Sequence, residues 1–516
     1  MAVQVFQRRL ATQADPAQLY AALSDGGRRA DTGVFEGRDG RSLVMAGAAL
    51  RVTCRGARVE IDALTPNGAA LLGGALAQLP GERVEAGAMR VVLDVPPPTS
   101  DNADARLIAP APIHALRALV AAAGATAAEP FAATLLGVLA FEHAGLSEGM
   151  ATTANEDGAV PDFLFWVAES LIVIEAGAPA RLLCTAFGGP DAGETERLCN
   201  DAAQRLAKLH AACEAVVAPP TYEPIAAVAV RAEPDLDDAA YCAVVSRCRE
   251  EIAAGEVYQI VPSRTFRSRC PAPMAAYAAL RLVEPASYRF FVAAAGWTLL
   301  GASPETSLRL FRETARGGRM VEVRPIAGTR PRGASDDEDD RLEAEMRLDA
   351  KELAEHMMLV DLARNDVARV SLPGTRRVAK LLTVERYARV MHLVSSVTGR
   401  LRIGFDAFDA IAACLNVGTL TGAPKVRATQ LLRDLEASRR GPYGGAIAWI
   451  NGDGLMDSAV VIRSALVRDG VAEVRAGAGV VHDSDPQSEA DETRRKASAL
   501  LGVLAATQGS GGEQGA

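Results

Sequence analysis

The stretch that most constrains this chain is a glycine-rich loop that runs directly into a helix. The sequence Gly-Thr-Leu-Thr-Gly-Ala-Pro occupies residues 418–424, and a helix is predicted over 425–436. Pro424 is expected at the first helical position, where its fixed φ suits the helix and its missing N–H costs nothing. Backbone N–H groups, hydroxyls and the positive end of the helix dipole would then converge on one point, which suits a carboxylate or a phosphate.

The helix dipole alone contributes only about 0.3–1 kcal/mol, so an anion site at this loop also needs fixed cations and a metal. A turn that only starts a helix would have the same sequence pattern. The Gly-Lys-Ser/Thr ending of the phosphate loops in nucleotide hydrolases is missing.

Composition excludes several classes of protein. The chain has 516 residues, enough for two or three core-sized units, and its 49 % hydrophobic and 23 % charged content is ordinary for a globular protein. A net charge of −9 gives no electrostatic case for nucleic acid or an anionic membrane. No stretch is predicted to be a secretory signal or a membrane span. The eight cysteines show no Cys-x-x-Cys pair, which favours reduced thiols and a cytoplasmic protein.

The order of predicted elements indicates an α+β fold. Strands are predicted over 43–52, 58–64 and 163–175, and the proline-rich stretch 216–234 is interpreted as a linker. Residues 235–500 are expected to hold a large, mostly antiparallel sheet, with one strand over 457–467 between two hairpin turns. The acidic run 336–340 is expected to be a solvated loop, and the last residues, 501–516, a flexible tail.

Two residues near the end of this sheet could contact a ligand. Arg463 is expected to share a strand face with Val461 and Ala465, so its charge needs either a structural carboxylate or a substrate carboxylate as partner. Tyr443 is flanked by glycines that leave room for a ligand to approach its hydroxyl. A tyrosine of this kind, taken alone, is more often packed in a core.

Two acidic clusters could hold a divalent cation. Asp349 and Glu352 form a capping-box pattern for a helix on which Glu355 points toward the apolar side, and Glu489 belongs to an acidic run at 488–493. Two carboxylates from separate segments suit Mg²⁺, although each cluster alone is more simply explained as solvated helix surface. His392 stands in an apolar stretch, where it is either structural or a group that exchanges protons near neutral pH.

Together these segments resemble the chorismate-utilising enzymes, and within them component I of anthranilate synthase. The resemblance is dense from about 235 to 500 and thin before that. Its segments are Gly-Glu-Val-Tyr-Gln-Ile-Val-Pro-Ser-Arg at 255–264, Gly-Ala-Ser-Pro-Glu at 301–305, Pro-Ile-Ala-Gly-Thr-Arg-Pro-Arg-Gly at 325–333, Asp-Leu-Ala-Arg-Asn-Asp at 361–366, Met-His-Leu-Val-Ser at 391–395, the 418–424 loop, Ile-Arg-Ser at 462–464, Ala-Gly-Ala-Gly at 476–479 and Pro-Gln-Ser-Glu-Ala-Asp-Glu-Thr at 486–493.

This resemblance implies an anthranilate synthase component I-like fold, in which two interleaved parts surround opposed, mostly antiparallel β-sheets with flanking helices. It implies an N-terminal domain over 1–215 and a chorismate-binding catalytic domain over 235–500. Mg²⁺ would bind Glu355 and Glu489. Glu305 would be the acid that helps the C4 hydroxyl leave, and His392 would assist the loss of pyruvate. The implied catalytic set is His392, Glu305, Gln259 and Thr419. The implied substrate-binding set is Gly418, Thr419, Gly422, Tyr443, Arg463, Gly477, Ala478, Gly479 and Lys496.

Two positions bear on the nucleophile that the resemblance implies. Family members that add water carry a lysine base where this chain has Gln259, and those that aminate C4 carry a lysine in place of Ala327. The resemblance therefore implies addition of ammonia at C2 of chorismate, followed by elimination of pyruvate to give anthranilate. No cysteine lies in a Gly-flanked elbow, so we expect a separate glutamine amidotransferase subunit to supply the ammonia in a hetero-oligomer.

The N-terminal half departs from the family at its tryptophan feedback site. The family's Leu-Leu-Glu-Ser signature reads Val-Phe-Glu-Gly here, so Gly37 follows Glu36 in place of serine, and Arg41 replaces a lysine. After Tyr288, Arg289 replaces a methionine-like residue, and a buried guanidinium beside an indole would cost several kcal/mol unless paired. We therefore expect tryptophan to inhibit weakly or not at all.

The altered feedback site leaves a second function open. The chain could be an aminodeoxyisochorismate synthase of specialised, antibiotic-type metabolism, which keeps the enolpyruvyl group. A third possibility, a non-catalytic chorismate-binding subunit, predicts broken metal or acid positions, whereas Glu305, Glu355 and Glu489 are all present.

Overall fold

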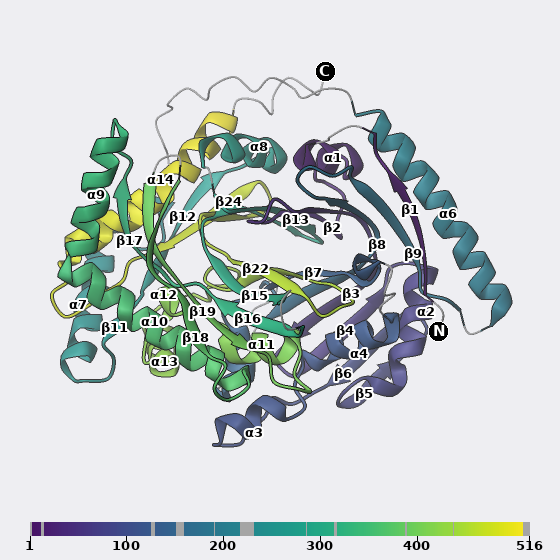
Figure 1. Ribbon diagram of the computed structural model, residues 1–516, viewed down its shortest axis with the longest axis horizontal. Coiled ribbons are helices and arrows are strands. Elements are labelled where there is room, and N and C mark those ends of the chain that lie inside the picture. The colour runs from purple at the N-terminus through teal and green to yellow at the C-terminus, as the bar shows by residue number, and fades with distance from the viewer. Residues whose placement is uncertain are drawn as a thin grey trace.

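Two opposed β-sheets flanked by helices make up the computed structural model (Figure 1). The structure describes residues 3–11, 15–124, 129–150, 159–189, 191–216, 232–284, 286–313, 317–387, 390–436 and 438–508. All strand pairs are antiparallel, including the predicted hairpin of β3 (Ser42–Arg55) and β4 (Arg58–Ala63). The α+β architecture expected from the sequence is confirmed.

Both sheets meet at two long strands, β3 and β8 (Phe163–Ile174), which pair along most of their length. From β3 the first sheet continues through β2 (Thr32–Glu36), β13 (Tyr288–Ala294), β14 (Trp297–Ser303), β23 (Ser464–Arg468), β24 (Val471–Gly477) and β12 (Ser263–Arg269). From β8 the second sheet continues through β7 (Leu135–Leu139), β21 (Ala446–Ile450), β22 (Met456–Val460), β15 (Thr306–Arg312), β16 (Arg319–Val323) and β19 (Val390–Arg400).

Shorter strands extend these sheets at their edges. β17 (Ile326–Pro331) and β18 (Arg377–Arg386) pair with β19, while β9 (Arg181–Ala186) pairs with β8 and β1 (Gln4–Arg9). β6 (Arg90–Asp94) joins β4 to β5 (Glu82–Ala86), and β10 (Glu233–Pro234) pairs with β12. β2 and β7 come from the first 215 residues but lie beside β13 and β21 from the second half. The two parts of the chain are therefore interleaved, as expected.

Three apolar layers hold this arrangement. Between the sheets, Phe35 and Phe290 of the first pack with Leu136 and Ile447 of the second. The outer face of the first sheet is covered by α1 (Pro16–Leu23), α6 (Ala192–Glu214), α8 (Pro273–Val283) and α14 (Pro486–Thr507). The outer face of the second is covered by α2 (Pro66–Ala75), α4 (His114–Ala123), α10 (Ala350–Val370) and α11 (Ala407–Cys414), as Figure 1 shows.

Three predictions about local structure were wrong. The strand expected over 457–467 is broken between β22 and β23, and Arg463 lies in the break with φ at +50°. The acidic run 336–340 begins α9 (Asp336–Leu348), because carboxylates are favoured at a helix N-terminus and Ser335 caps it. The tail expected from 501 is in part the end of α14, where Leu501 and Leu504 are buried.

Other predictions need smaller corrections. Pro424 is the N-cap of α13 (Lys425–Leu435) rather than its first helical residue, and α12 (Gly418–Thr421) forms one helical turn before it. Asp349 caps α10 by accepting from the N–H groups of Lys351 and Glu352, and the helix runs to Val370. Most of the expected linker 216–234 lies outside the described residues, although its last two residues form β10.

Two absences agree with the composition. Among the described helices, none combines the length and the apolar character that crossing a membrane requires. All eight cysteines are described, and none is joined in a disulfide.

Candidate active site

A buried acid forms one wall of the candidate site. Glu305 lies in the turn between β14 and β15, and Thr419 of α12 donates its hydroxyl to Glu305 Oε1 at 2.7 Å. Burial raises the pKa of Glu305 to about 7, although the Thr419 hydrogen bond and the positive charge of Lys496 work in the other direction. A carboxyl group with this pKa is part protonated near neutral pH and can donate a proton.

Glu355 and Glu489 form an acidic pair from two separate helices. Glu355 of α10 accepts from Gln259 Nε2 at 2.8 Å, and Glu489 lies in the first turn of α14. Burial raises the pKa of both carboxyl groups, and both feel the charges of Glu492 and Lys351. The two carboxylates therefore have two charged neighbours in common, Glu492 and Lys351.

This acidic pair suits a divalent cation. Two buried carboxylates near a third acid repel one another, and a bound cation would relieve that repulsion. Within the described ranges, no group of three or more metal-ligating side chains is present. Mg²⁺ binds through one or two protein carboxylates plus substrate oxygens, so a pair is enough for it.

The opposite end of the site carries positive charge. Arg463 donates from Nη1 to the Lys496 carbonyl at 3.2 Å, and Lys496 Nζ donates to the Gly477 carbonyl at 2.9 Å. A side chain at Gly477 would come within 3.0 Å of the Tyr443 hydroxyl, so glycine is needed for the close approach of that tyrosine. The charge of Arg463 acts on both Tyr443 and His392. Arg463 and Tyr443 are therefore candidates to bind a carboxylate.

The left-handed backbone of Arg463 explains why sequence reasoning placed it wrongly in a strand. A non-glycine residue at φ +50° costs about 1–3 kcal/mol, and such strain gathers at functional sites. The break between β22 and β23 gives Arg463 this conformation, in which its guanidinium reaches α14.

The glycine-rich loop lies beside Gln259. Gly422 and Ala423 form β20, which pairs with β11 (Gln259–Ile260). A Cβ atom at Gly422 would come within 2.1 Å of the Gln259 carbonyl oxygen, and one at Gly479 within 2.8 Å of Gln259 Nε2. Gly422 is therefore required by its close packing against the Gln259 backbone, whereas a side chain at Gly479 would first meet the flexible end of the Gln259 side chain. Ala478 is fully buried, and its N–H donates to the Pro262 carbonyl next to this loop.

His392 projects from β19. Its Nδ1 lies 2.9 Å from the Thr329 hydroxyl. Burial, together with the charge of Arg463, lowers the pKa of His392 below its ordinary value, so the imidazole is neutral at pH 7 and can accept a proton. Thr329 was not singled out from the sequence, although it lies inside the quoted segment 325–333.

The sequence analysis also missed a buried charge cluster behind Tyr443. Glu436 bridges Arg440 at 2.6 Å and Arg475 at 3.0 Å. Although burial opposes ionisation, the two guanidiniums hold the pKa of Glu436 below its ordinary value. The adjacent pair Arg439-Arg440, just before the glycine-flanked tyrosine, is the sequence signal that could have indicated it.

The altered feedback residues lie in a second region, between the halves of the chain. Glu36 of β2 is opposite Arg289 of β13, yet their side chains approach only to 3.9 Å. Glu36 instead pairs with Arg281 at 2.8 Å and accepts from Tyr277 at 2.7 Å. Tyr288 donates to Asp457 at 2.9 Å. The Gly37 N–H donates to the Arg41 carbonyl at 2.7 Å.

The Arg41 side chain covers two aromatic rings in this region. Its guanidinium lies 5.4 Å from the ring centre of Phe131 and 5.7 Å from that of Trp449. Glu175 fixes it with an ion pair of 2.9 Å. Arg41 thus occupies an aromatic surface by cation–π contact.

The fold and these motifs define a class of enzyme. A model of the family described as chorismate binding enzyme matches residues 97–502, and the chain belongs to this family of chorismate-utilising enzymes.

Within that family, the relatives are anthranilate synthase components. The chain is 42 % identical to anthranilate synthase component 1 of Vibrio cholerae, over 98 % of this chain and 97 % of that protein. It is 44 % identical to component 1 of Escherichia coli, over 90 % and 89 % of the two chains. It is 45 % identical to the pyocyanine-specific component 1 of Pseudomonas aeruginosa, over 92 % and 89 %.

Solved structures agree with this assignment. The crystal structure of anthranilate synthase component I from Streptococcus pneumoniae matches with a TM-score of 0.69 and 27 % identity, over 89 % of this chain and 92 % of that one. The isochorismate synthase MenF of Escherichia coli, 19 % identical, shares the fold with a TM-score of 0.67, over 98 % and 95 %.

Proposed function

We propose that this enzyme aminates chorismate at C2 with ammonia and then eliminates pyruvate to form anthranilate. The observation that carries the proposal is Glu305, a buried acid with a pKa of about 7 held by Thr419. Loss of the C4 hydroxyl needs a proton donor in a site of low polarity, and Glu305 supplies one near neutral pH.

The charges of the site are arranged for a dicarboxylic substrate. Glu355 and Glu489 would hold Mg²⁺ at one end, next to the loop that carries Gly418 and Thr419. When bound, the metal would neutralise the ring carboxylate and polarise a departing oxygen. At the other end Arg463 and Tyr443 bind the enolpyruvyl carboxylate, while Lys496, which is paired with Glu492 at 2.6 Å, lies beside Gly477.

Gln259 favours ammonia as the nucleophile. Its amide donates to Glu355 and has no proton-accepting nitrogen, so it cannot activate water as a base. Ammonia needs no such base because its nitrogen already carries a free electron pair. A glutamine amidotransferase subunit would deliver it, since none of the buried cysteines of this chain is activated; Cys414, for example, has its pKa raised by burial to about 12.

His392 is proposed to complete the reaction. Its neutral imidazole accepts the C2 proton as the C3–oxygen bond breaks, and the departing enolpyruvate takes up a proton at its methylene carbon to become pyruvate. Thr329 orients the ring by its contact with Nδ1, which leaves the other ring nitrogen for the substrate.

A second candidate function is an aminodeoxyisochorismate synthase that releases the intermediate with its enolpyruvyl group. The observation that favours it is Arg41 on the aromatic rings of the altered feedback region, because loss of feedback is expected of a specialised pathway. The relative named pyocyanine specific, 45 % identical to this chain, is itself named an anthranilate synthase component, so its name supports a specialised pathway but not release of the intermediate.

Mass analysis of the products distinguishes these two functions. The full chain is incubated with chorismate, Mg²⁺ and an ammonium salt at alkaline pH, where free ammonia is abundant. Anthranilate and pyruvate in equal amounts are expected, and His392→Met should accumulate the aminated intermediate instead. Release of that intermediate by the unaltered enzyme would decide for the second function, and no turnover with ammonia would contradict both.

A further inference from the structure

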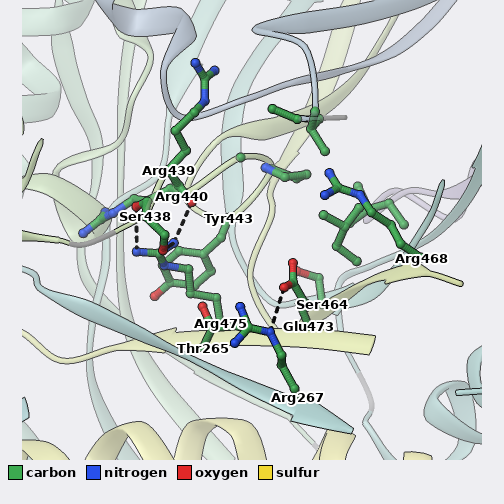
Figure 2. A pocket seen from close by; sticks show the side chains of 16 residues that line it. Thr265, Arg267, Ser438, Arg439, Arg440, Tyr443, Ser464, Arg468, Glu473 and Arg475 are labelled. Atoms are coloured by element: carbon green, nitrogen blue, oxygen red, sulfur yellow. Dashed lines mark hydrogen bonds and ion pairs between the residues drawn. The ribbon is translucent and has the colours of Figure 1, made fainter. Parts of the chain in front are cut away.

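A cavity of about 250 Å³ lies beside Tyr443, and five of the sixteen residues that line it are arginines (Figure 2). It is bounded by β12, β23, β24 and the segment 438–443. We propose that this arginine cavity is a second anion-binding site, separate from the chorismate site, and that it takes a small dicarboxylate.

The deep end of the cavity carries a fixed excess of positive charge. Arg440 and Arg475 share a single carboxylate, Glu436, and all three side chains are less than a tenth exposed. Each guanidinium also donates to backbone carbonyls, so the cluster is rigid. Two positive charges balanced by one negative charge leave one positive charge at the cavity floor.

Arg468 adds a second uncompensated charge. Its side chain lines the cavity from β23, and no carboxylate of the described residues lies within ion-pair distance of it. Its Nε is buried and makes no hydrogen bond to any described group. A buried guanidinium nitrogen without an acceptor is costly, and a bound oxyanion would satisfy it.

The other arginines do not cancel this excess. Arg267 pairs with Glu473 at 3.0 Å, and these two half-exposed side chains form the mouth of the cavity. Arg439 is paired with Asp162 at 2.8 Å and also lies 3.8 Å from Glu142, whose charge acts on Arg433 as well. Each of these ion pairs is neutral, so the cavity keeps about two positive charges, which match the charge of a dicarboxylate.

The remaining lining selects the kind of anion. Leu299, Leu466 and Pro442 cover part of the wall, while Thr265 and Ser464 add hydroxyls. Apolar side chains favour a ligand with a carbon skeleton over a fully hydrated inorganic ion. Guanidinium groups bind carboxylates through two parallel hydrogen bonds, which gives a planar carboxylate a geometric advantage.

Calorimetry with malonate as the probe tests this site on the full chain without chorismate. Malonate should bind to the unaltered protein, and Arg468→Gln should weaken it at least tenfold. Arg267→Gln, a change at the half-exposed mouth, should weaken it less. Arg197→Gln removes an exposed arginine from the outer helix α6 and is the matched control that should bind malonate normally.

Two further measurements distinguish binding of malonate in this cavity from binding elsewhere on the protein. Arg463→Gln removes the proposed substrate arginine, so malonate binding should persist in that variant. Loss of binding in Arg463→Gln with retention in a folded Arg468→Gln would place malonate in the chorismate site and overturn the proposal. Binding of inorganic phosphate but not malonate would overturn the assignment to a carboxylate, as would no binding of either.

Discussion

At the scale of single residues, burial sets the pH range of the acid Glu305, and the hydrogen bond from Thr419 opposes it. Burial raises the Glu305 pKa to about 7 from an ordinary value of about 4.3, so the proton that it donates is present below pH 7 and lost above it. At a fixed concentration of free ammonia, kcat/KM for chorismate should therefore fall about tenfold for each pH unit above this pKa. Steady-state rates in a series of buffers, with total ammonium adjusted at each pH, measure this fall, which is the alkaline limb of the pH profile.

Substitution of Thr419 shows whether the limb belongs to Glu305. The threonine hydroxyl stabilises the ionised carboxylate, so Thr419→Val should raise the Glu305 pKa and move the falling limb to higher pH. Thr419→Ser keeps the hydroxyl and should leave the limb in place. If kcat/KM falls at the same pH in Thr419→Val as in the unaltered enzyme, the alkaline limb belongs to another group.

At the scale of elements, the last turns of α14 are part of the core rather than a tail. Leu504 is fully buried against the first sheet, so Leu504→Ala should destabilise the protein by about 2–5 kcal/mol. Two residues earlier, a Cβ at Gly502 would meet nothing within 4 Å, and Gly502→Ala should stabilise the helix by about 0.5–1 kcal/mol. The midpoints of thermal unfolding should therefore shift in opposite directions. Equal midpoints for Leu504→Ala and the unaltered protein would show that this segment is a tail and not part of the core.

The same helix shows which elements could be predicted from the sequence. Alternating apolar residues and turn glycines were enough for β3, β4 and β8, because these signals are local. The end of α14 was missed because the glycine-rich last residues outweighed its apolar spacing. The break at Arg463 depends on contacts with Lys496, thirty-three residues away, which no local pattern contains. For the same reason the sequence motifs named the residues of the candidate site but not Thr329 or the arginine cavity.

At the scale of the whole molecule, interleaving puts residues from both halves into the altered feedback region. Arg41 and Phe131 come from the first 215 residues, whereas Trp449 and Arg289 come from the second part. Neither part alone contains this surface, so an effector bound there would contact both. A guanidinium already lying on the rings would have to be displaced by an indole, which makes the region a poor tryptophan site.

Titration calorimetry with tryptophan tests this consequence. The unaltered protein should show no binding tighter than about 1 mM, equivalent to about −4 kcal/mol, because Arg41 covers Phe131 and Trp449 while Glu175 holds it there. The triple change Gly37→Ser, Arg41→Lys and Arg289→Met removes both guanidiniums and restores the serine of the family signature. A Cβ at residue 37 would lie 3.1 Å from the Arg41 carbonyl oxygen, so the serine needs a shift of only a few tenths of an ångström. The triple variant should therefore bind tryptophan measurably tighter, and micromolar binding by the unaltered protein would show that the two arginines do not close the site.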